Sequence, residues 1–117
     1  MSNTAFPFVP ENLLANLSKI KPYVLLILTK GENYGMVDTP RIIQSEHFPY
    51  VFKQREEGIM SLTMPVMDES NIAAVAVYNT TDKEEVRKLV ENDPAVKAGV
   101  FNYEIVTGLG LPGDTLP

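Results

Sequence analysis

The segment Glu91–Ile105 limits the possible folds most, because it links a helix to a strand with few residues between them. The helix runs into Asp93-Pro94, one further turn follows, and Gly99 breaks this turn before a strand begins at Val100. Proline is accepted in a first helical turn, whereas glycine adopts the backbone conformation that ends a helix. The segment therefore predicts a helix, a tight connection and a strand in immediate succession.

Apolar runs predict four strands. Tyr23–Leu28 (YVLLIL) is a continuous apolar run that is too short for a typical helix, which indicates a central strand buried on both faces. Alternating or small apolar residues predict the other strands. These are Ile59–Met64, which Pro65 ends, Ile72–Tyr78, and Val100–Val106. The polar segment from Lys30 to Pro40 is expected to be a loop.

Helical spacing predicts a helix between the first two strands. Phe48, Val51 and Phe52 lie at positions i, i+3 and i+4 and are expected to face the core. The polar residues 53–57, Gln54 among them, are then expected to face water. Gly58 is expected to end the helix as a left-handed cap.

Two signals indicate where helices begin. Pro49 fits a first turn, and if helix already exists around Ile42–Glu46, it should kink that helix. Thr81 and Glu84 form the T-x-x-E capping box of a second helix. That helix is expected to bury Val86, Leu89 and Val90.

The ends of the chain are expected to lie outside the domain. Residues 1–21 form an N-terminal extension, in which Glu11–Leu17 predicts a short helix started by Pro10. Its Leu13, Leu14 and Leu17 are expected to lie against the domain or a partner subunit. The α+β domain spans residues 22–107, and residues 108–117 form an irregular C-terminal tail that is rich in glycine and proline.

The order strand, helix, strand, strand, helix, strand is that of the ferredoxin-like plait. We therefore expect an α+β fold, with a four-stranded antiparallel sheet and two helices on one face. The other face also needs cover, and so short a chain has no further element to cover it. A second copy can, which predicts a homodimer with the sheets face to face.

Composition excludes several classes of function. A net charge of -5 argues against a nucleic-acid partner, because phosphate binding relies on clustered basic residues. The absence of cysteine removes disulfides, thiolate-bound metals and thiol nucleophiles, and it fits a reducing cytoplasm. One histidine leaves only carboxylates as further ligands, so neither a metal nor another cofactor is expected. No apolar run approaches the length of about 20 residues that spans a membrane.

Three segments resemble the YCII family. HFPYVFKQREEGIMSL is similar to the family's histidine-led helix, TTDKEEVRKLVENDP to its second helix, and AVKAGVFNYEI to the segment before its last strand. The resemblance covers roughly Tyr23 to Val106. It implies a dimeric α+β barrel with a His–Asp pair in a cleft, and these residues fall on His47 and Asp93. The chain departs from the family at Met64-Pro65, where relatives carry Gly-Pro.

His47 and Asp93 are the candidate catalytic residues. Histidine exchanges protons near neutral pH, and a carboxylate partner sets its tautomer. The alternatives are a histidine in a cap or surface contact, and an Asp-Pro turn whose carboxylate only holds backbone N–H groups. As substrate-binding residues we expect Met64, Tyr78 and Tyr103.

Two classes of function follow from these residues. The first is a small enzyme that uses the His–Asp pair for acid/base chemistry of isomerase, lyase or hydrolase type, on a small cyclic or carbonyl-bearing molecule. The second is a non-catalytic dimer that binds a metabolite or a partner. A polar cleft that both side chains enter favours the first class, and an apolar pocket closed to water favours the second.

Overall fold

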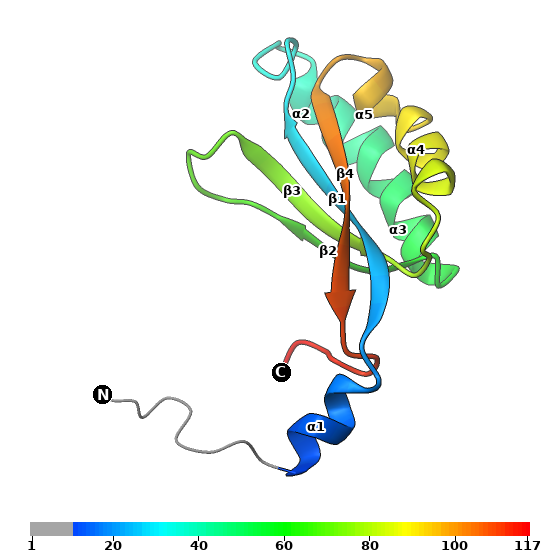
Figure 1. The fold of residues 1–117 in the computed structure, drawn as a ribbon. Helices are drawn as coiled ribbons and strands as arrows, with labels where there is room; N and C mark the ends of the chain where they lie inside the picture. The colour runs from blue at the N-terminus through cyan, green and yellow to red at the C-terminus, as the bar shows by residue number, and fades with distance from the viewer. Residues whose placement is uncertain (1–10) are drawn as a thin grey trace.

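The computed structural model describes residues 11–117, with side chains from Leu14 onward. It contains one four-stranded antiparallel sheet in the order β2-β3-β1-β4, with helices packed on one face (Figure 1). This confirms the predicted ferredoxin-like α+β plait. The strands are β1 (Lys21–Lys30), β2 (Met60–Pro65), β3 (Ile72–Tyr78) and β4 (Phe101–Gly110). The helices are α1 (Glu11–Leu17), α2 (Thr39–Ile42), the π-helical turn η1 (Ile43–His47), α3 (Phe48–Glu56), α4 (Lys83–Glu91) and α5 (Pro94–Lys97).

The core lies between the helices and one face of the sheet. On β1 the buried residues alternate along the strand, and they are Val24, Leu26 and Leu28. Leu25 and Ile27 point to the outer face and are only half-buried in the single chain. The prediction that β1 is buried on both faces is therefore confirmed only for the face that packs against the helices. None of the helices within residues 11–117 has the length and apolarity to cross a membrane.

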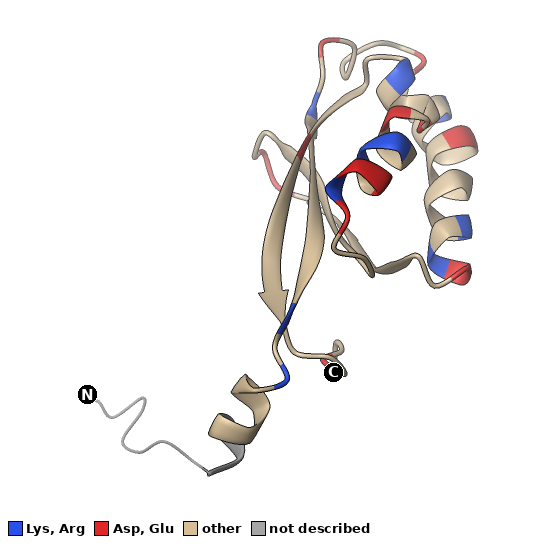
Figure 2. Cartoon of the chain, turned by 45° about the vertical axis from the view of Figure 1, so that its right-hand side comes forward, with Lys and Arg blue, Asp and Glu red and all other residues tan. Residues whose placement is uncertain are grey.

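Charged side chains lie mainly on the helices and loops, while the strands carry few of them (Figure 2). This distribution follows from the layered fold, because each helix keeps one side toward water while one face of every strand packs against the helices.

Helices α2, η1 and α3 follow one another without a break. The η1 turn widens the helix, so that the Phe48 N–H bonds to the carbonyl of Ile43, five residues earlier. Pro49 follows directly, and a proline ring inside a helix presses on the carbonyl four residues before it. The sequence predicted a kink if helix preceded Pro49, and the irregularity that occurs there is this π-helical turn.

The prediction of which side of α3 is buried was right for Val51, which is 8% exposed, and wrong for the two phenylalanines. Phe48 and Phe52 are 36% and 47% exposed, while Gln54 is 5% exposed. The buried stripe consists of His47, Val51 and Gln54, at positions i, i+4 and i+7. Two of these residues are polar and have partners across the core, which hydrophobic spacing alone does not reveal.

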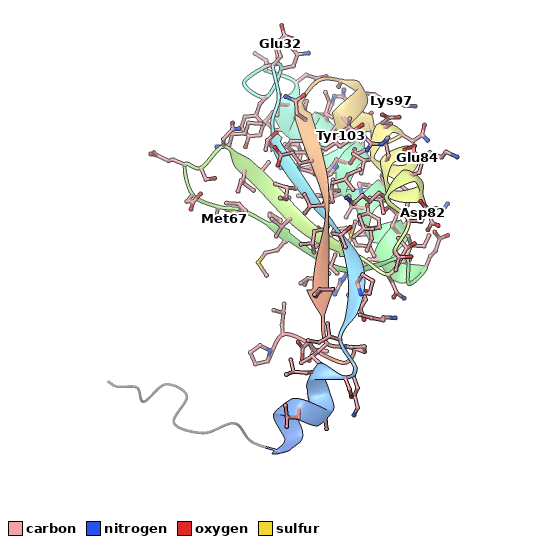
Figure 3. All side chains as sticks on the ribbon, in the orientation of Figure 1. Glu32, Met67, Asp82, Glu84, Lys97 and Tyr103 are labelled. Carbon is pink, nitrogen blue, oxygen red and sulfur yellow. The ribbon has the colours of Figure 1, made fainter. Side chains whose placement is uncertain are left out.

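Helix α4 begins one residue later than predicted. Its cap is Asp82, whose Oδ1 accepts hydrogen bonds from the Glu84 and Glu85 N–H groups at 2.9 and 3.4 Å. The predicted cap, Thr81, is therefore wrong, and Figure 3 labels Asp82 at the start of the helix. Val86 and Val90 are buried as predicted, whereas Leu89 is half-buried.

Both ends of the domain reach further than the sequence predicted. Strand β4 continues to Gly110 because β1 begins at Lys21 and offers these residues a pairing partner. The irregular tail therefore begins at residue 111, not at 108. Helix α1 is confirmed, but its Leu14 and Leu17 are 64% and 49% exposed and so do not pack tightly on the domain. The side chain of Leu13, and Pro10 at the expected start of this helix, lie outside what the structure describes.

Glycines end two helices as predicted. Gly58 follows α3 with a φ of 77°, and Gly99 follows α5 with a φ of 76°. Gly99 also lies close to the loop after β1, since its carbonyl accepts the Asn33 N–H at 2.9 Å. This contact holds the α5–β4 turn, and with it the position of Asp93, against the end of β1.

Candidate active site

His47 lies where the long helical segment faces the sheet. It is the last residue of η1 and is 5% exposed. The ring of Phe101 meets the imidazole edge-on, with 5.1 Å between ring centroids, and Phe48 lies at 5.7 Å. These apolar neighbours lower the local dielectric, so a charge or hydrogen bond at His47 acts more strongly than it would in water.

Asp93 reaches the same place from the end of α4. It caps α5, because its Oδ1 accepts the Ala95 N–H at 2.9 Å while Pro94 occupies the first helical turn. Its second oxygen, Oδ2, lies 2.7 Å from Nδ1 of His47. Asp93 is 4% exposed. The structure thus joins the two predicted residues by a direct, buried hydrogen bond, and Asp93 combines this contact with the backbone-holding role that the sequence also indicated.

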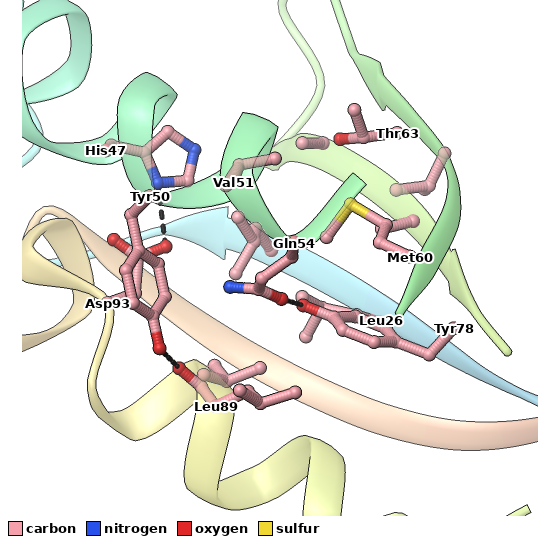
Figure 4. Close-up of a pocket in the computed structure, with 15 residues that line it drawn as sticks. Leu26, His47, Tyr50, Val51, Gln54, Met60, Thr63, Tyr78, Leu89 and Asp93 are labelled. Carbon is pink, nitrogen blue, oxygen red and sulfur yellow. Dashed lines mark hydrogen bonds and ion pairs between the residues drawn. The ribbon is translucent and has the colours of Figure 1, made fainter. Parts of the chain in front are cut away.

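The hydrogen bond determines which ring nitrogen carries a proton. An ionised carboxylate can only accept, so Nδ1 of His47 is the donor. In a neutral imidazole Nε2 then carries a lone pair. Among the residues described, none forms a hydrogen bond with Nε2, which lies on the far side of the ring from Asp93 (Figure 4). This nitrogen can accept a proton from a molecule in the adjacent cavity.

Two tyrosines and a glutamine complete the polar surroundings of the pair. The Tyr50 hydroxyl reaches from α3 to α4 and donates to the carbonyl of Leu89 at 2.8 Å. The Tyr78 hydroxyl donates to Oε1 of Gln54 at 2.7 Å (Figure 4). These bonds span neighbouring elements, so they order the side chains around His47.

Both phenols keep their protons. Burial raises the pKa of the Tyr78 hydroxyl, and the nearby charges of Tyr50 and Asp93 add to this effect. Burial also raises the pKa of Tyr50, with a further contribution from the charge of Asp93. At neutral pH both hydroxyls are therefore hydrogen-bond donors.

A cavity of about 20 Å³ lies between these side chains. This space is about the size of one water molecule, and it is far smaller than a typical ligand pocket of about 300 Å³ or more. Its lining comes from η1, α3, α4, the turn before α5, β1, β2 and β3, and includes His47, Tyr50, Val51, Gln54, Met60, Thr63, Tyr78 and Asp93. A substrate larger than water can reach His47 only if some of these side chains move.

The three predicted substrate-binding residues lie apart from one another. Tyr78 lines the cavity. Met64 is paired with Val75 and so lies on the outer face of the sheet, where it is 40% exposed. Tyr103 lies beside α4 and donates to Glu91 at 2.7 Å (Figure 3). Neither Met64 nor Tyr103 lines the cavity beside His47.

Sequence reasoning missed Gln54 and Tyr50 as residues of the site. Gln54 sits in a run of polar residues that looks like a solvated helix face, and nothing in its immediate sequence sets it apart. One signal was available, because Gln54 lies seven residues after His47 and therefore shares its helix face. Tyr50 lies three residues after His47, and the same argument applies to it.

The fold and the buried pair define a class: a small ferredoxin-like α+β plait with one histidine and one aspartate bonded beneath its helices. A solved structure shares this fold. It is the 5-chloro-2-hydroxyhydroquinone dehydrochlorinase TftG from Burkholderia phenoliruptrix AC1100, in complex with 2,5-dihydroxybenzoquinone. The TM-score is 0.53 at 20% sequence identity, and the alignment covers 73% of this chain and 90% of that one.

Sequence comparisons add no family. No protein-family model matches the chain, and no curated protein sequence matches it either. The similarity to the dehydrochlorinase therefore shows the fold alone, and membership in the YCII family stays a prediction from the three resembling segments.

Proposed function

We propose that this protein is a small YCII-like enzyme that uses His47 and Asp93 as a general acid/base pair on a small cyclic or carbonyl-bearing molecule. The observation that carries this proposal is the 2.7 Å bond between His47 Nδ1 and Asp93 Oδ2 beside a cavity, where no residue in the described part of the chain binds the opposite ring nitrogen. The reaction belongs to the isomerase, lyase or hydrolase type, because each of these needs one group that takes a proton and returns it.

The pair works in the following order. Nε2 of His47 accepts a proton from the substrate and the ring becomes an imidazolium, whose charge the Asp93 carboxylate stabilises. The proton then passes to another atom of the substrate or to a leaving group, and the ring is neutral again. The Ala95 N–H holds the carboxylate in place, so the imidazole needs no reorientation between the two steps.

A ring-shaped substrate is supported by the neighbour of the same fold. That enzyme acts on a chlorinated hydroxyhydroquinone, and its structure contains a dihydroxybenzoquinone. These compounds are the starting set for tests on this chain. The acid/base chemistry at His47 rests on its hydrogen bond with Asp93. The absence of cysteine supports a cytoplasmic location.

The proposed assembly is a homodimer. The outer face of the sheet carries apolar side chains from all four strands, paired across the sheet in register. They are Leu25, Ile27, Leu62, Met64, Val75, Val77 and Val106. Burial of this face against a second copy removes it from water, which is the main driving force for permanent dimers. Met64 then lies in the interface, and it contacts a ligand only where the two subunits form a shared site.

Light scattering tests the dimer. The protein should run at about twice the chain mass, and Leu25→Lys, which places a charge at the centre of the apolar face, should shift it to the monomer. Val37→Lys is the matched control, because Val37 is 100% exposed in a loop. A wild-type monomer at micromolar concentration would remove this part of the proposal.

The catalytic proposal is tested with a panel of hydroxyquinones, hydroxyhydroquinones and cyclic ketones, followed by absorbance and proton NMR. His47→Gln should lower turnover of any converted compound by about 100-fold or more, the usual contribution of a positioned acid/base group. Ser45→Ala, an exposed position in the same turn, is the control and should retain activity. Equal turnover by the His47 variant would overturn the catalytic role.

The alternative function is a non-catalytic binding module, and the small cavity favours it. In that case the pair mainly ties η1 to α5, and the His47→Gln variant binds ligands as the wild type does, without turnover by either protein. Binding without conversion of any compound in the panel, unchanged in the variant, would support this alternative over the enzyme.

A further inference from the structure

Gln54 is a third buried polar residue that lines the cavity, besides His47 and Asp93. It is 5% exposed, and its Oε1 accepts the hydrogen bond from the Tyr78 hydroxyl at 2.7 Å. Its amide nitrogen, Nε2, has two N–H donors, and the described part of the chain provides no acceptor for either. In Figure 4 this nitrogen is turned away from Tyr78, toward Tyr50 and Asp93. A buried N–H donor without an acceptor lowers the stability of the fold, unless a water or ligand oxygen in front of it accepts the hydrogen bond.

Tyr78 determines which end of the amide faces the cavity. Its hydroxyl keeps its proton, because burial raises the pKa of the phenol, and in the structure this hydroxyl donates to Oε1 of Gln54. A donor attracts the amide oxygen, and the nitrogen must then point the other way. Tyr78 is 2% exposed and its ring is part of the core, so the phenol itself is held in place.

The cavity has the size of one oxygen-bearing group. At about 20 Å³ it accommodates one water molecule or one oxygen atom of a ligand, and both Gln54 and His47 line it. The two residues lie on one face of the helical segment, two turns apart, which is about 10 Å along the axis. A small ring can contact both residues only when some of the lining side chains move, and it then places an oxygen at Gln54 and a reacting carbon near His47.

We propose that Gln54 Nε2 binds the carbonyl oxygen of a small conjugated ring substrate, and that Tyr78 is the positioning residue that aims this amide. The inference rests on the acid/base function proposed for His47. When Nε2 of His47 removes a proton from a tetrahedral ring carbon next to the conjugated system, the C–H bond breaks and its electron pair moves through that system to the carbonyl oxygen. Gln54 then donates to the oxygen in the state where it carries negative charge, which is how fixed donors lower a reaction barrier.

This inference narrows the reaction type. Hydrolysis needs an attacking water, whereas a donor for a conjugated oxygen favours proton removal next to an unsaturated ring, as in isomerisation or elimination. The substrate class is therefore a small unsaturated ring ketone, including the keto tautomer of a hydroxyquinone, and a hydroxyquinone itself serves as a binding probe with the same oxygen. A hydrocarbon ring of the same size lacks the oxygen and should bind poorly, because it leaves Gln54 Nε2 unpaired.

The test uses variants that remove the donor without leaving another buried group unpaired. The double variant Gln54→Met/Tyr78→Phe replaces both partners of the hydrogen bond by apolar side chains of similar shape, a change that is often nearly neutral for stability. Urea unfolding and light scattering check its fold and assembly. Tyr78→Phe alone keeps the amide but removes the group that orients it.

Binding of 2,5-dihydroxybenzoquinone and of toluene is measured by calorimetry. The wild type should prefer the quinone, and the double variant should bind it about 10- to 100-fold more weakly while its affinity for toluene stays the same or rises. The Gln54 side-chain amide resonances should shift in the wild type when the quinone is added. In Tyr78→Phe the loss of quinone affinity should be smaller than in the double variant, and the quinone-induced shift of the Gln54 amide resonances should be reduced. A purely structural role of Tyr78 would not produce this difference.

The possible results distinguish a failure of the Gln54 proposal from a failure of the acid/base proposal. Quinone binding that weakens in His47→Gln but is unchanged in the double variant would overturn the role of Gln54 and leave the acid/base proposal intact. Absence of quinone binding in the wild type, or binding that neither variant alters, counts against the proposed function and the inference together. If the amide resonances do not respond to the quinone, Gln54 does not contact it, and the proposal is also overturned.

Discussion

Asp93→Asn should reverse the tautomer of His47 while leaving most of the fold intact. In the wild type, Asp93 Oδ2 accepts a proton from His47 Nδ1 at 2.7 Å, and Oδ1 accepts the Ala95 N–H at 2.9 Å. Asparagine has one oxygen and one NH₂ group. If its oxygen keeps the backbone bond that caps α5, its NH₂ group faces Nδ1, which must then accept. The ring proton moves to Nε2, and the nitrogen that faces the cavity can no longer act as a base.

The expected loss of stability follows from the bonds that each substitution removes. Asp93→Asn keeps the cap and exchanges a charge-assisted bond for a neutral one, which costs about 1 kcal/mol of unfolding free energy. Asp93→Ala removes the cap, worth about 0.5–2 kcal/mol, and leaves the His47 donor unpaired, worth about 1.5–3 kcal/mol. The sum is about 2–5 kcal/mol, so the alanine variant should be clearly less stable than the asparagine variant.

The assay is nitrogen-15 NMR of the imidazole. His47 is the only histidine in the chain, so its two ring nitrogens give unambiguous signals. The wild type should show the proton on Nδ1 and the asparagine variant on Nε2, with urea unfolding recorded on the same samples. A proton on Nε2 in the wild type, or a tautomer that Asp93→Asn leaves unchanged, would refute this account of the pair.

Three further predictions concern the fold. Val86→Ala should lower the unfolding free energy by about 2 kcal/mol and Leu89→Ala by about 1–2 kcal/mol, because Val86 is 0% exposed whereas Leu89 is half-buried; urea unfolding measures both. The pKa of Tyr78 is higher in the folded state than in the unfolded chain. The protonated phenol therefore contributes to stability below about pH 10, and this contribution is lost as the pH rises further. Tyr78→Phe should reduce the pH dependence of the unfolding free energy above that pH. Gly99→Ala should lower the thermal midpoint, because φ is +76° and the new methyl group would lie 2.7 Å from the Asn33 amide nitrogen; an unchanged midpoint would show that the turn relaxes freely.

Local sequence signals were sufficient for the order and type of the main elements. Short apolar runs, the glycines at positions 58 and 99, and the Asp93-Pro94 turn each depend on neighbouring residues only. The signals failed where the decision involves a distant partner. Residues 108–110 form a strand because β1 lies beside them, and no property of the sequence Gly-Leu-Gly predicts this pairing.

In the candidate site, too, local signals predicted some features while others depended on distant residues. His47 and Asp93 were identifiable because a single histidine and a helix-capping aspartate stand out in the sequence, and the resemblance to the YCII family pairs them. That they touch, at 46 residues apart, is a property of the folded chain. The size of the cavity and the place of Met64 on the outer face also follow from the packing of the helices and the register of the strands.

By itself, the sequence determined the alternation of strands and helices, and with it the plait, because period, turn residues and caps act over a few residues. Only the tertiary structure decided which side of α3 is buried. Hydrophobic spacing favoured Phe48 and Phe52, yet Gln54 lies inside because Tyr78, 24 residues away, supplies the hydrogen bond that makes its burial tolerable. A buried polar group is stable only with its partner, and that partner is brought near by the fold.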